Sequence, residues 1–192
     1  MRWTGLVLLA FSLCSPLPAA HLGMGLRVGE VTQTSAIVWT RITATAERNH
    51  EGFREPKKRQ PKQKKYVPSA VDVAKRQGEI SGAAGQLRLS WHARGGLRSR
   101  VTAWVDVTAR TDFVHQFQIE KLQPGTEYLL RVEARDGKDA KITARAEGSF
   151  HTPHRSKRWQ NVSFTVVTGQ SYWDLDDPAG YNIYPAMNRL KP

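Results

Sequence analysis

The histidines and the C-terminal aspartates are the side chains that could hold a metal ion or move a proton, and they are scattered along the sequence. Four of the six histidines lie on different predicted strands or at the end of the last one, and three aspartates share one loop. These residues are His92, His115, His151, His154, Asp174, Asp176 and Asp177. A metal centre needs several such ligands converging on one point, and neither this spacing nor the single cysteine, Cys14, brings them together. We therefore expect no metal site among the histidines.

The strongest charge feature is the run from residue 54 to residue 65. It carries seven lysines and arginines and one glutamate, a net +6 that is half of the +12 of the whole protein. Its two prolines and its lack of apolar residues keep it out of a core, so we expect a mobile loop inserted between strands. Such a run attracts anionic polymers in a salt-dependent way, although no interleaved aromatic residues specify nucleic acid. The candidate polyanion-binding residues are Lys57, Lys58, Arg59, Lys62, Lys64 and Lys65.

The stretch from Leu122 to Ala134 indicates the kind of secondary structure that positions the candidate residues. From Tyr128 onward, alternate residues share a face, and this period of two predicts a strand with one buried face. Pro124-Gly125 makes a tight corner before it. The spacing Leu-x-Pro-x-Thr-x-Tyr resembles the corner between the fifth and sixth strands of fibronectin type III domains, where the tyrosine hydroxyl bonds to the corner backbone. An ordinary turn followed by a hairpin strand is the alternative.

Short strands separated by turn signals account for most of the chain. They predict an antiparallel β-sandwich of the fibronectin III or immunoglobulin type over residues 23–153, with an insertion at about residues 45–85. The predicted strands cover residues 25–31, 34–41, 87–94, 101–107, 113–119, 128–134 and 142–150. In the second strand Ser35, Ile37 and Trp39 share a face, and we expect Trp39 at the centre of the core. An exposed, ligand-binding Trp39 is the alternative.

The first 20 residues are typical of a secretory signal peptide. Arg2 supplies the charge, residues 6–13 form the apolar segment, and Leu17-Pro-Ala-Ala20 offers small residues for cleavage. The apolar segment is too short to span a bilayer as a helix. We therefore expect a secreted protein, periplasmic or extracellular, with no transmembrane segment in the mature chain and no disulfide once Cys14 is removed.

The character of the chain changes after a linker at residues 154–160. Val162–Thr168 is a nearly continuous β-branched and aromatic run, which predicts a strand buried on both faces. A loop follows, and then an apolar stripe predicts a short helix in which Pro185 is tolerated only in the first turn. The stripe consists of Ile183, Met187 and Leu190. Strand, loop and helix predict the truncated start of an α/β domain over residues 161–192, because one strand and one helix cannot bury each other's faces.

Three stretches in this order resemble the PhoD-like alkaline phosphatases, a family of metallophosphoesterases. They are residues 25–43 (GLRVGEVTQTSAIVWTRIT), the corner from Leu122 to Tyr128, and Phe164–Tyr172 (FTVVTGQSY) with Tyr184–Met187 (YPAM). The resemblance covers nearly all of the mature chain but only the first element of the catalytic domain. It implies a secreted hydrolase with a fibronectin-like N-terminal domain. It also implies an α/β domain that hydrolyses phosphate monoesters or diesters with metals such as iron, calcium or zinc.

The sequence departs from this family in the loop after the first catalytic strand. Where members often have a metal-binding cysteine before the glutamine, this chain has Gly169, which has no side chain to bind a metal. The other ligands that the resemblance implies would follow later strands that this sequence does not include. Gln170, Tyr172 and Asp174 are only weak candidates near the family site. We therefore expect the N-terminal part of such a phosphatase, from a truncated gene or a fragment, with no catalytic residue and no bound metal of its own.

Two other functions fit the sequence. A secreted β-sandwich could be a binding module for an anionic polymer or a protein partner, and a tight, salt-sensitive affinity for polyanions would favour it. A structural sandwich without any ligand is the third possibility.

Overall fold

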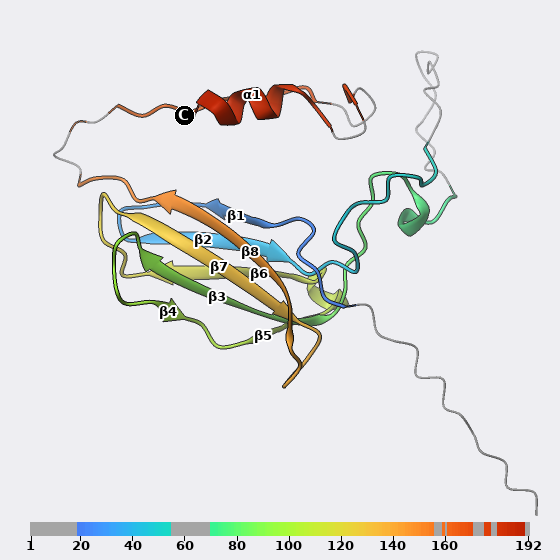
Figure 1. The fold of residues 1–192 in the computed structure, drawn as a ribbon, viewed down its shortest axis with the longest axis horizontal. Helices are drawn as coiled ribbons and strands as arrows, with labels where there is room; N and C mark the ends of the chain where they lie inside the picture. Colours follow the sequence, from blue (N-terminus) through green and yellow to red (C-terminus); the bar gives the residue numbers. More distant parts are fainter. Residues whose placement is uncertain are drawn as a thin grey trace, which may run out of the picture.

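The protein is represented by a computed structural model that describes residues 19–54, 70–155, 159, 161–170, 175–177 and 180–190. Two antiparallel sheets face each other and form a β-sandwich (Figure 1). The smaller sheet has the order β1-β2-β6, and the larger has the order β4-β3-β7-β8, with β5 also paired to β3. The strands are β1 (Leu26–Gly29), β2 (Ser35–Arg41), β3 (Gly85–Ala93), β4 (Arg100–Val101), β5 (Val105–Val107), β6 (Val114–Glu120), β7 (Glu127–Arg135) and β8 (Ile142–His151). The fibronectin-like, mainly β fold that the sequence predicts is confirmed.

Alternate residues of the strands fill the space between the two sheets. In β7 the buried apolar residues are Tyr128, Leu130, Val132 and Ala134, as the period of two predicts. Across the sandwich, Phe117 and Ile119 of β6 are buried as well, and the side chains of β3 complete the core. The fully or nearly fully buried apolar residues elsewhere are Ala20, Ala36, Val38, Ile42, Leu87, Leu89, Val107 and Leu122. Burial of this apolar surface is the main favourable contribution to folding.

The expected place of Trp39 in the core is wrong. The buried side chains of β2 are Ala36, Val38 and Thr40, whereas Trp39 lies half-buried on the opposite, outward side of the strand. Successive side chains of a strand point to opposite faces, so only one of the two sets can reach the core. The polar side chain of Thr40 can be buried because its hydroxyl donates a hydrogen bond to the Gly25 carbonyl at 2.9 Å.

The single strand expected at residues 101–107 is also wrong, because the structure divides it. β4 ends at Val101, which is 59% exposed, and β5 begins at Val105, so that Val107 is buried in the core and Val105 packs half-buried against it. Between them, the ring of Trp104 is stacked by two guanidinium groups. The guanidinium carbons of Arg88 and Arg135 lie 4.6 and 4.2 Å from the ring centroid. These cation–π contacts hold Trp104 on the outer surface of the larger sheet.

The tyrosine corner is present as predicted. The Gln123 backbone N–H donates to the Tyr128 hydroxyl at 2.8 Å, and the Leu122 side chain is 4% exposed beneath the corner. Gly125 lies in the left-handed region with φ of +65°, where a side chain is rarely tolerated. An added Cβ there would also collide with the His154 ring. The corner therefore requires glycine at this position.

The same corner holds the segment through which the chain leaves the sandwich. Thr152 is 2% exposed, and its hydroxyl accepts from the Thr126 N–H at 3.0 Å and donates to the Gln123 carbonyl at 2.6 Å. Two backbone bonds add to this: Thr152 N–H to the Thr126 carbonyl, and Gly125 N–H to the Pro153 carbonyl, both at 3.0 Å. We call this group of contacts the exit clamp.

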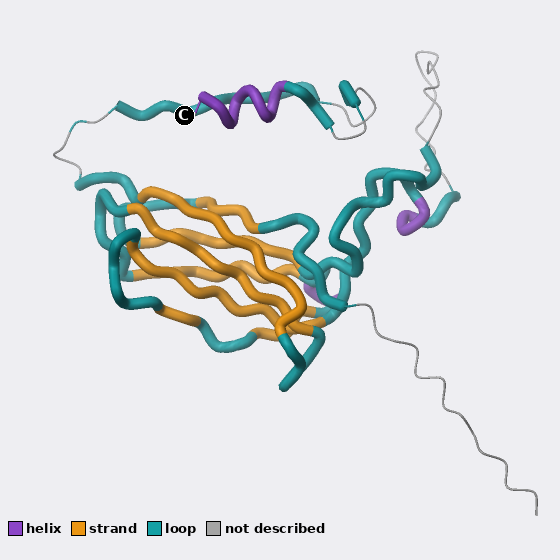
Figure 2. The backbone as a smooth tube through the Cα atoms, in the orientation of Figure 1, coloured by secondary structure: helices purple, strands orange, loops and turns teal. Residues whose placement is uncertain are grey.

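The residues that follow the sandwich contain one helix and no strand among the described positions. The helix α1 (Ile183–Leu190) forms where the apolar stripe predicts it, with Pro185 in its first turn. The strand expected at 162–168 is absent, and Val162, Phe164 and Val166 are 73, 75 and 77% exposed. Figure 2 draws residues 161–170 as loop and α1 as helix. The expected α/β start is therefore not confirmed by the structure. Within the described residues, no helix has the length and apolarity to cross a membrane.

Candidate functional site

Most of the residues predicted to bind polyanions or to lie near a catalytic centre fall outside the described part of the chain. This holds for Lys57, Lys58, Arg59, Lys62, Lys64, Lys65, Tyr172 and Asp174. Gly169 and Gln170 are described, and both are exposed. The Gln170 side-chain carbonyl accepts a hydrogen bond from the Tyr184 hydroxyl on α1. Gln170 therefore ties the loop to the helix.

The two described aspartates of the C-terminal loop serve its backbone. Asp176 accepts from the Asn182 N–H at 2.8 Å, and Asp177 accepts from the Gly180 N–H at 3.1 Å. Asp177 lines an open hollow of about 480 Å³, together with Arg48, Tyr181 and Tyr184. These carboxylates stabilise the turn before α1, as aspartates commonly do through local bonds to the backbone.

A metal centre of the kind that the family resemblance implies does not fit the described residues. Gly169 offers no side-chain ligand, and one oxygen of each carboxylate, Asp176 Oδ2 and Asp177 Oδ1, accepts a backbone hydrogen bond within the turn. Among the described positions, no three histidine, cysteine or carboxylate side chains gather where they could hold one ion. We derive no metal-dependent step from this part of the chain.

His115 and His154 make contacts that belong to the packing of the sandwich. The His115 ring meets the Phe117 ring edge-to-face, with centroids 4.5 Å apart. Burial lowers the pKa of His115, because an imidazolium is poorly solvated there. His154 lies over Gly125, and its carbonyl accepts from the Gln33 side chain at 3.0 Å. The structure thus leaves these histidines apart from one another.

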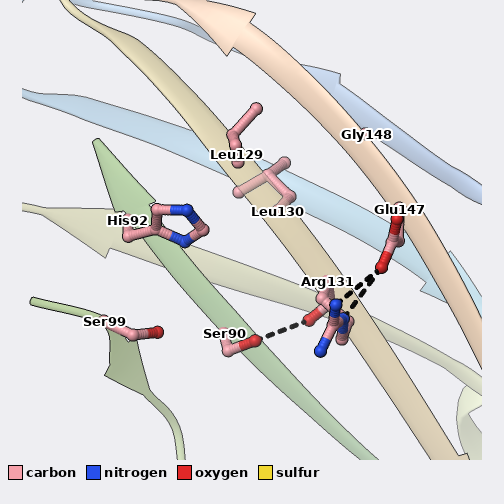
Figure 3. A pocket seen from close by; sticks show the side chains of 8 residues that line it. All are labelled: Ser90, His92, Ser99, Leu129, Leu130, Arg131, Glu147 and Gly148. Atoms are coloured by element: carbon pink, nitrogen blue, oxygen red, sulfur yellow. Dashed lines mark hydrogen bonds and ion pairs between the residues drawn. The ribbon is translucent and has the colours of Figure 1, made fainter. Parts of the chain in front are cut away.

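A shallow hollow of about 300 Å³ lies on the outer face of the larger sheet (Figure 3). Its wall includes Ser90, His92, Ser99, Leu129, Arg131 and Glu147. Here Arg131 is paired with Glu147 at 2.9 Å, and Ser90 makes a long bond of 3.4 Å to the Arg131 carbonyl. A serine nucleophile needs a base within hydrogen-bond reach. Ser99 donates to the Arg100 carbonyl at 3.5 Å, and within the described structure neither serine forms such a bond to His92.

The strongest electrostatic feature of this face is a row of three charged residues across β3, β7 and β8, which we call the charged row. Arg88 and Arg145 bind the two carboxylate oxygens of Glu133 at 2.7 and 3.1 Å. Burial raises the pKa of Glu133, but the hydrogen bonds from both arginines lower it by more, so that it lies below its ordinary value. Arg88 and Arg145 are therefore both paired with a carboxylate of their own sheet.

Two of these features escape prediction from the sequence. The residues of the charged row occupy outward positions of three predicted strands, so the sequence shows that these positions carry opposite charges. The sequence does not show which strands pair, and it is this pairing that aligns Arg88, Glu133 and Arg145. The exit clamp depends on Thr152, which has no distinguishing pattern because its partners lie 26 and 29 positions away along the chain.

Comparison with solved structures finds distant β-sandwich matches. Among solved structures, PhoD matches with 13% identity over 72% of this chain and 20% of its own, at a TM-score of 0.41. The fn3 domain of the human collagen α-1(XX) chain matches with 13% identity over 86% of this chain and 98% of its own, at a TM-score of 0.38. These likenesses are too distant to carry an argument.

No curated protein matches the sequence significantly. A family model does: the N-terminal domain of PhoD-like phosphatases matches residues 14–153, which is well over half of the chain and includes the whole sandwich. The chain therefore belongs to the family of PhoD-like phosphatase N-terminal domains.

Proposed function

We propose that this chain provides the non-catalytic N-terminal sandwich of a secreted PhoD-like phosphatase. The observation that carries the proposal is the family match over residues 14–153. In this arrangement the hydrolysis of phosphate monoesters or diesters, and the iron, calcium or zinc that would assist it, belong to a catalytic domain of the family. The sandwich is a folded unit that holds the start of the following segment.

Chemical features of the chain support a non-catalytic role. The space between the sheets is filled by apolar side chains, and the arginines of the charged row are bound to Glu133. Electrostatic stabilisation of a phosphoryl group needs cations or N–H donors that are free to point at it. Gly169, at the position where relatives often place a cysteine ligand, contributes no side chain. We therefore propose that residues 1–192 alone do not hydrolyse phosphate esters.

A direct assay tests this proposal. The purified protein is incubated with p-nitrophenyl phosphate and bis-p-nitrophenyl phosphate, with zinc, iron, calcium or manganese added in turn, and its metal content is measured. We expect no turnover above the metal-only control and no stoichiometric metal. Turnover that survives purification and disappears with a chelator would show a catalytic site in this chain. A variant with Gly169→Cys is a useful companion, and we expect it to remain inactive because a single thiolate does not complete a two-metal site.

A second candidate function is binding of an anionic polymer through residues 54–65. The net charge of +6 in this run favours it. Because the arginines of the charged row are already paired, we attribute any strong polyanion affinity to this run rather than to the outer face of the larger sheet. Salt-dependent retention on heparin, lost when the run is deleted, would support it.

A further inference from the structure

Among the described residues, burial in the sandwich begins at Ala20. Ala19 is exposed, whereas Ala20 is completely buried and belongs to the hydrophobic core. The Ala20 N–H donates to an Asp136 carboxylate oxygen at 2.5 Å, and the Ala20 carbonyl accepts from the Thr143 hydroxyl at 2.7 Å. His21 then pairs with Thr43 through two backbone bonds of 2.9 Å. The change from exposed to buried thus occurs across one peptide bond.

Two cleavage positions satisfy the preference of signal peptidases for a small residue before the cut. One follows Ala19 and the other follows Ala20. Cleavage after Ala20 would remove a buried methyl group and the partners of Asp136 and Thr143. Cleavage after Ala19 would leave all of these contacts in place. The structure therefore favours the first position.

We propose that the signal peptide is cleaved between Ala19 and Ala20, and that the new α-ammonium group of Ala20 binds Asp136. In this hydrolysis, water breaks the C–N bond. The Ala19 carbonyl carbon gains the oxygen and becomes a carboxylate, and the Ala20 nitrogen takes up protons and becomes an ammonium group. The inference rests on the proposed secretion and adds to it the mature N-terminus and its partner.

Cleavage changes the chemistry of the contact with Asp136. A neutral amide N–H becomes a cation with three N–H donors, already positioned at hydrogen-bond distance from a carboxylate. The α-amino group is largely protonated at neutral pH, since its pKa is about 7.7–8.0 in unperturbed peptides, and hydrogen bonds between charged partners are stronger than neutral ones. Asp136 lies just after β7, in the connection to β8. The ion pair would fasten the mature N-terminus to that connection.

The first experiment determines the mature N-terminus. The full chain, with its own first residues, is expressed in a bacterial host, and the exported product is analysed by N-terminal sequencing and intact mass. We expect a product that begins at Ala20. A product that begins at His21 or at another nearby residue overturns this inference while secretion stands. A product that still begins at Met1 would contradict the proposed secretion, and the inference would fail with it.

The second experiment tests the ion pair on residues 20–192, produced with Ala20 as the first residue, so that it does not depend on the cleavage result. Asp136→Asn keeps an acceptor oxygen but removes the charge. Asp139→Asn is the matched control, because Asp139 is exposed in the same connection and its side chain has no hydrogen bond or ion pair among the described residues. We expect Asp136→Asn to lower the Tm by about 1–4 °C, the size of effect of a partly exposed ion pair in a domain of this size, and the control to leave it unchanged.

A chain of residues 19–192 provides the decisive comparison, because its ammonium group is displaced by one residue from Asp136. Asp136→Asn should lower the Tm of this longer chain by less than it lowers that of residues 20–192. Equal losses in the two chains, or no loss in either, would overturn the proposed ion pair.

Discussion

Removal of the Thr152 hydroxyl tests whether the exit clamp contributes as much as its geometry indicates. Thr152→Val replaces the hydroxyl by a methyl group of similar size at a position that is 2% exposed. The Thr126 N–H then loses its acceptor and the Gln123 carbonyl loses its donor. A buried polar group left without a partner costs about 1–3 kcal/mol. Because both groups lie at the partly solvated end of the sandwich, we expect a total loss of about 2–4 kcal/mol.

Two related variants make this magnitude interpretable. Thr152→Ser retains the hydroxyl and should cost less than about 1 kcal/mol, mainly for one lost methyl group. Tyr128→Phe removes one acceptor, that of the Gln123 N–H, and should cost about 0.5–1.5 kcal/mol. The expected order of destabilisation is therefore Thr152→Val first, then Tyr128→Phe, with Thr152→Ser similar to or smaller than Tyr128→Phe.

Urea unfolding, followed by tryptophan fluorescence, gives the free energies, and hydrogen exchange locates the effect. The Gly125 N–H, which donates to the Pro153 carbonyl, should exchange faster in Thr152→Val than in the parent protein. A free energy of unfolding for Thr152→Val equal to that of Thr152→Ser would refute the reasoning. It would mean that water or a relaxed backbone satisfies both orphaned groups.

The charged row, His115 and the basic run each give a further prediction. Glu133→Gln, at a carboxylate only 11% exposed, should cost about 1–3 kcal/mol by urea unfolding. The matched control Glu147→Gln, in a pair that is 54 and 67% exposed, should cost less than about 1 kcal/mol. Burial lowers the pKa of His115, so the unfolded chain binds this proton more readily. Stability should fall as the pH drops below the ordinary imidazole pKa of about 6.5, and His115→Phe should flatten this change. Deletion of residues 54–65 should leave the unfolding midpoint nearly unchanged and weaken retention on heparin, and loss of folding would contradict the predicted loop.

The strands that the sequence predicts best are those in which one face is clearly more apolar than the other. In β7 the set Tyr128, Leu130 and Val132 outweighs its outward neighbours, which include Arg131 and Glu133. In this case the period of two alone identifies the buried face. The tyrosine corner is predictable for a related reason, since its bond joins residues only five positions apart. Local spacing is then sufficient to define the contact.

β2 shows why the same procedure fails elsewhere. Ile37 and Trp39 are larger and more apolar than Ala36, Val38 and Thr40, so residue hydrophobicity favours the wrong face. The structure selects the smaller set because these side chains fit between the sheets and because Thr40 finds an acceptor at Gly25. That acceptor belongs to a neighbouring segment, and the sequence pattern of β2 contains no information about it.

The C-terminal stretch shows why helices are easier to predict from local sequence than strands. A helix makes its backbone hydrogen bonds within its own segment, so the residues of α1 can adopt it without a neighbouring chain. A strand makes its bonds to a neighbouring chain. The β-branched residues of 162–168 have the propensity but no paired neighbour among the described residues. The sequence therefore predicts the helix correctly and predicts only the capacity to form the strand, because a strand depends on a second segment that its own residues do not specify.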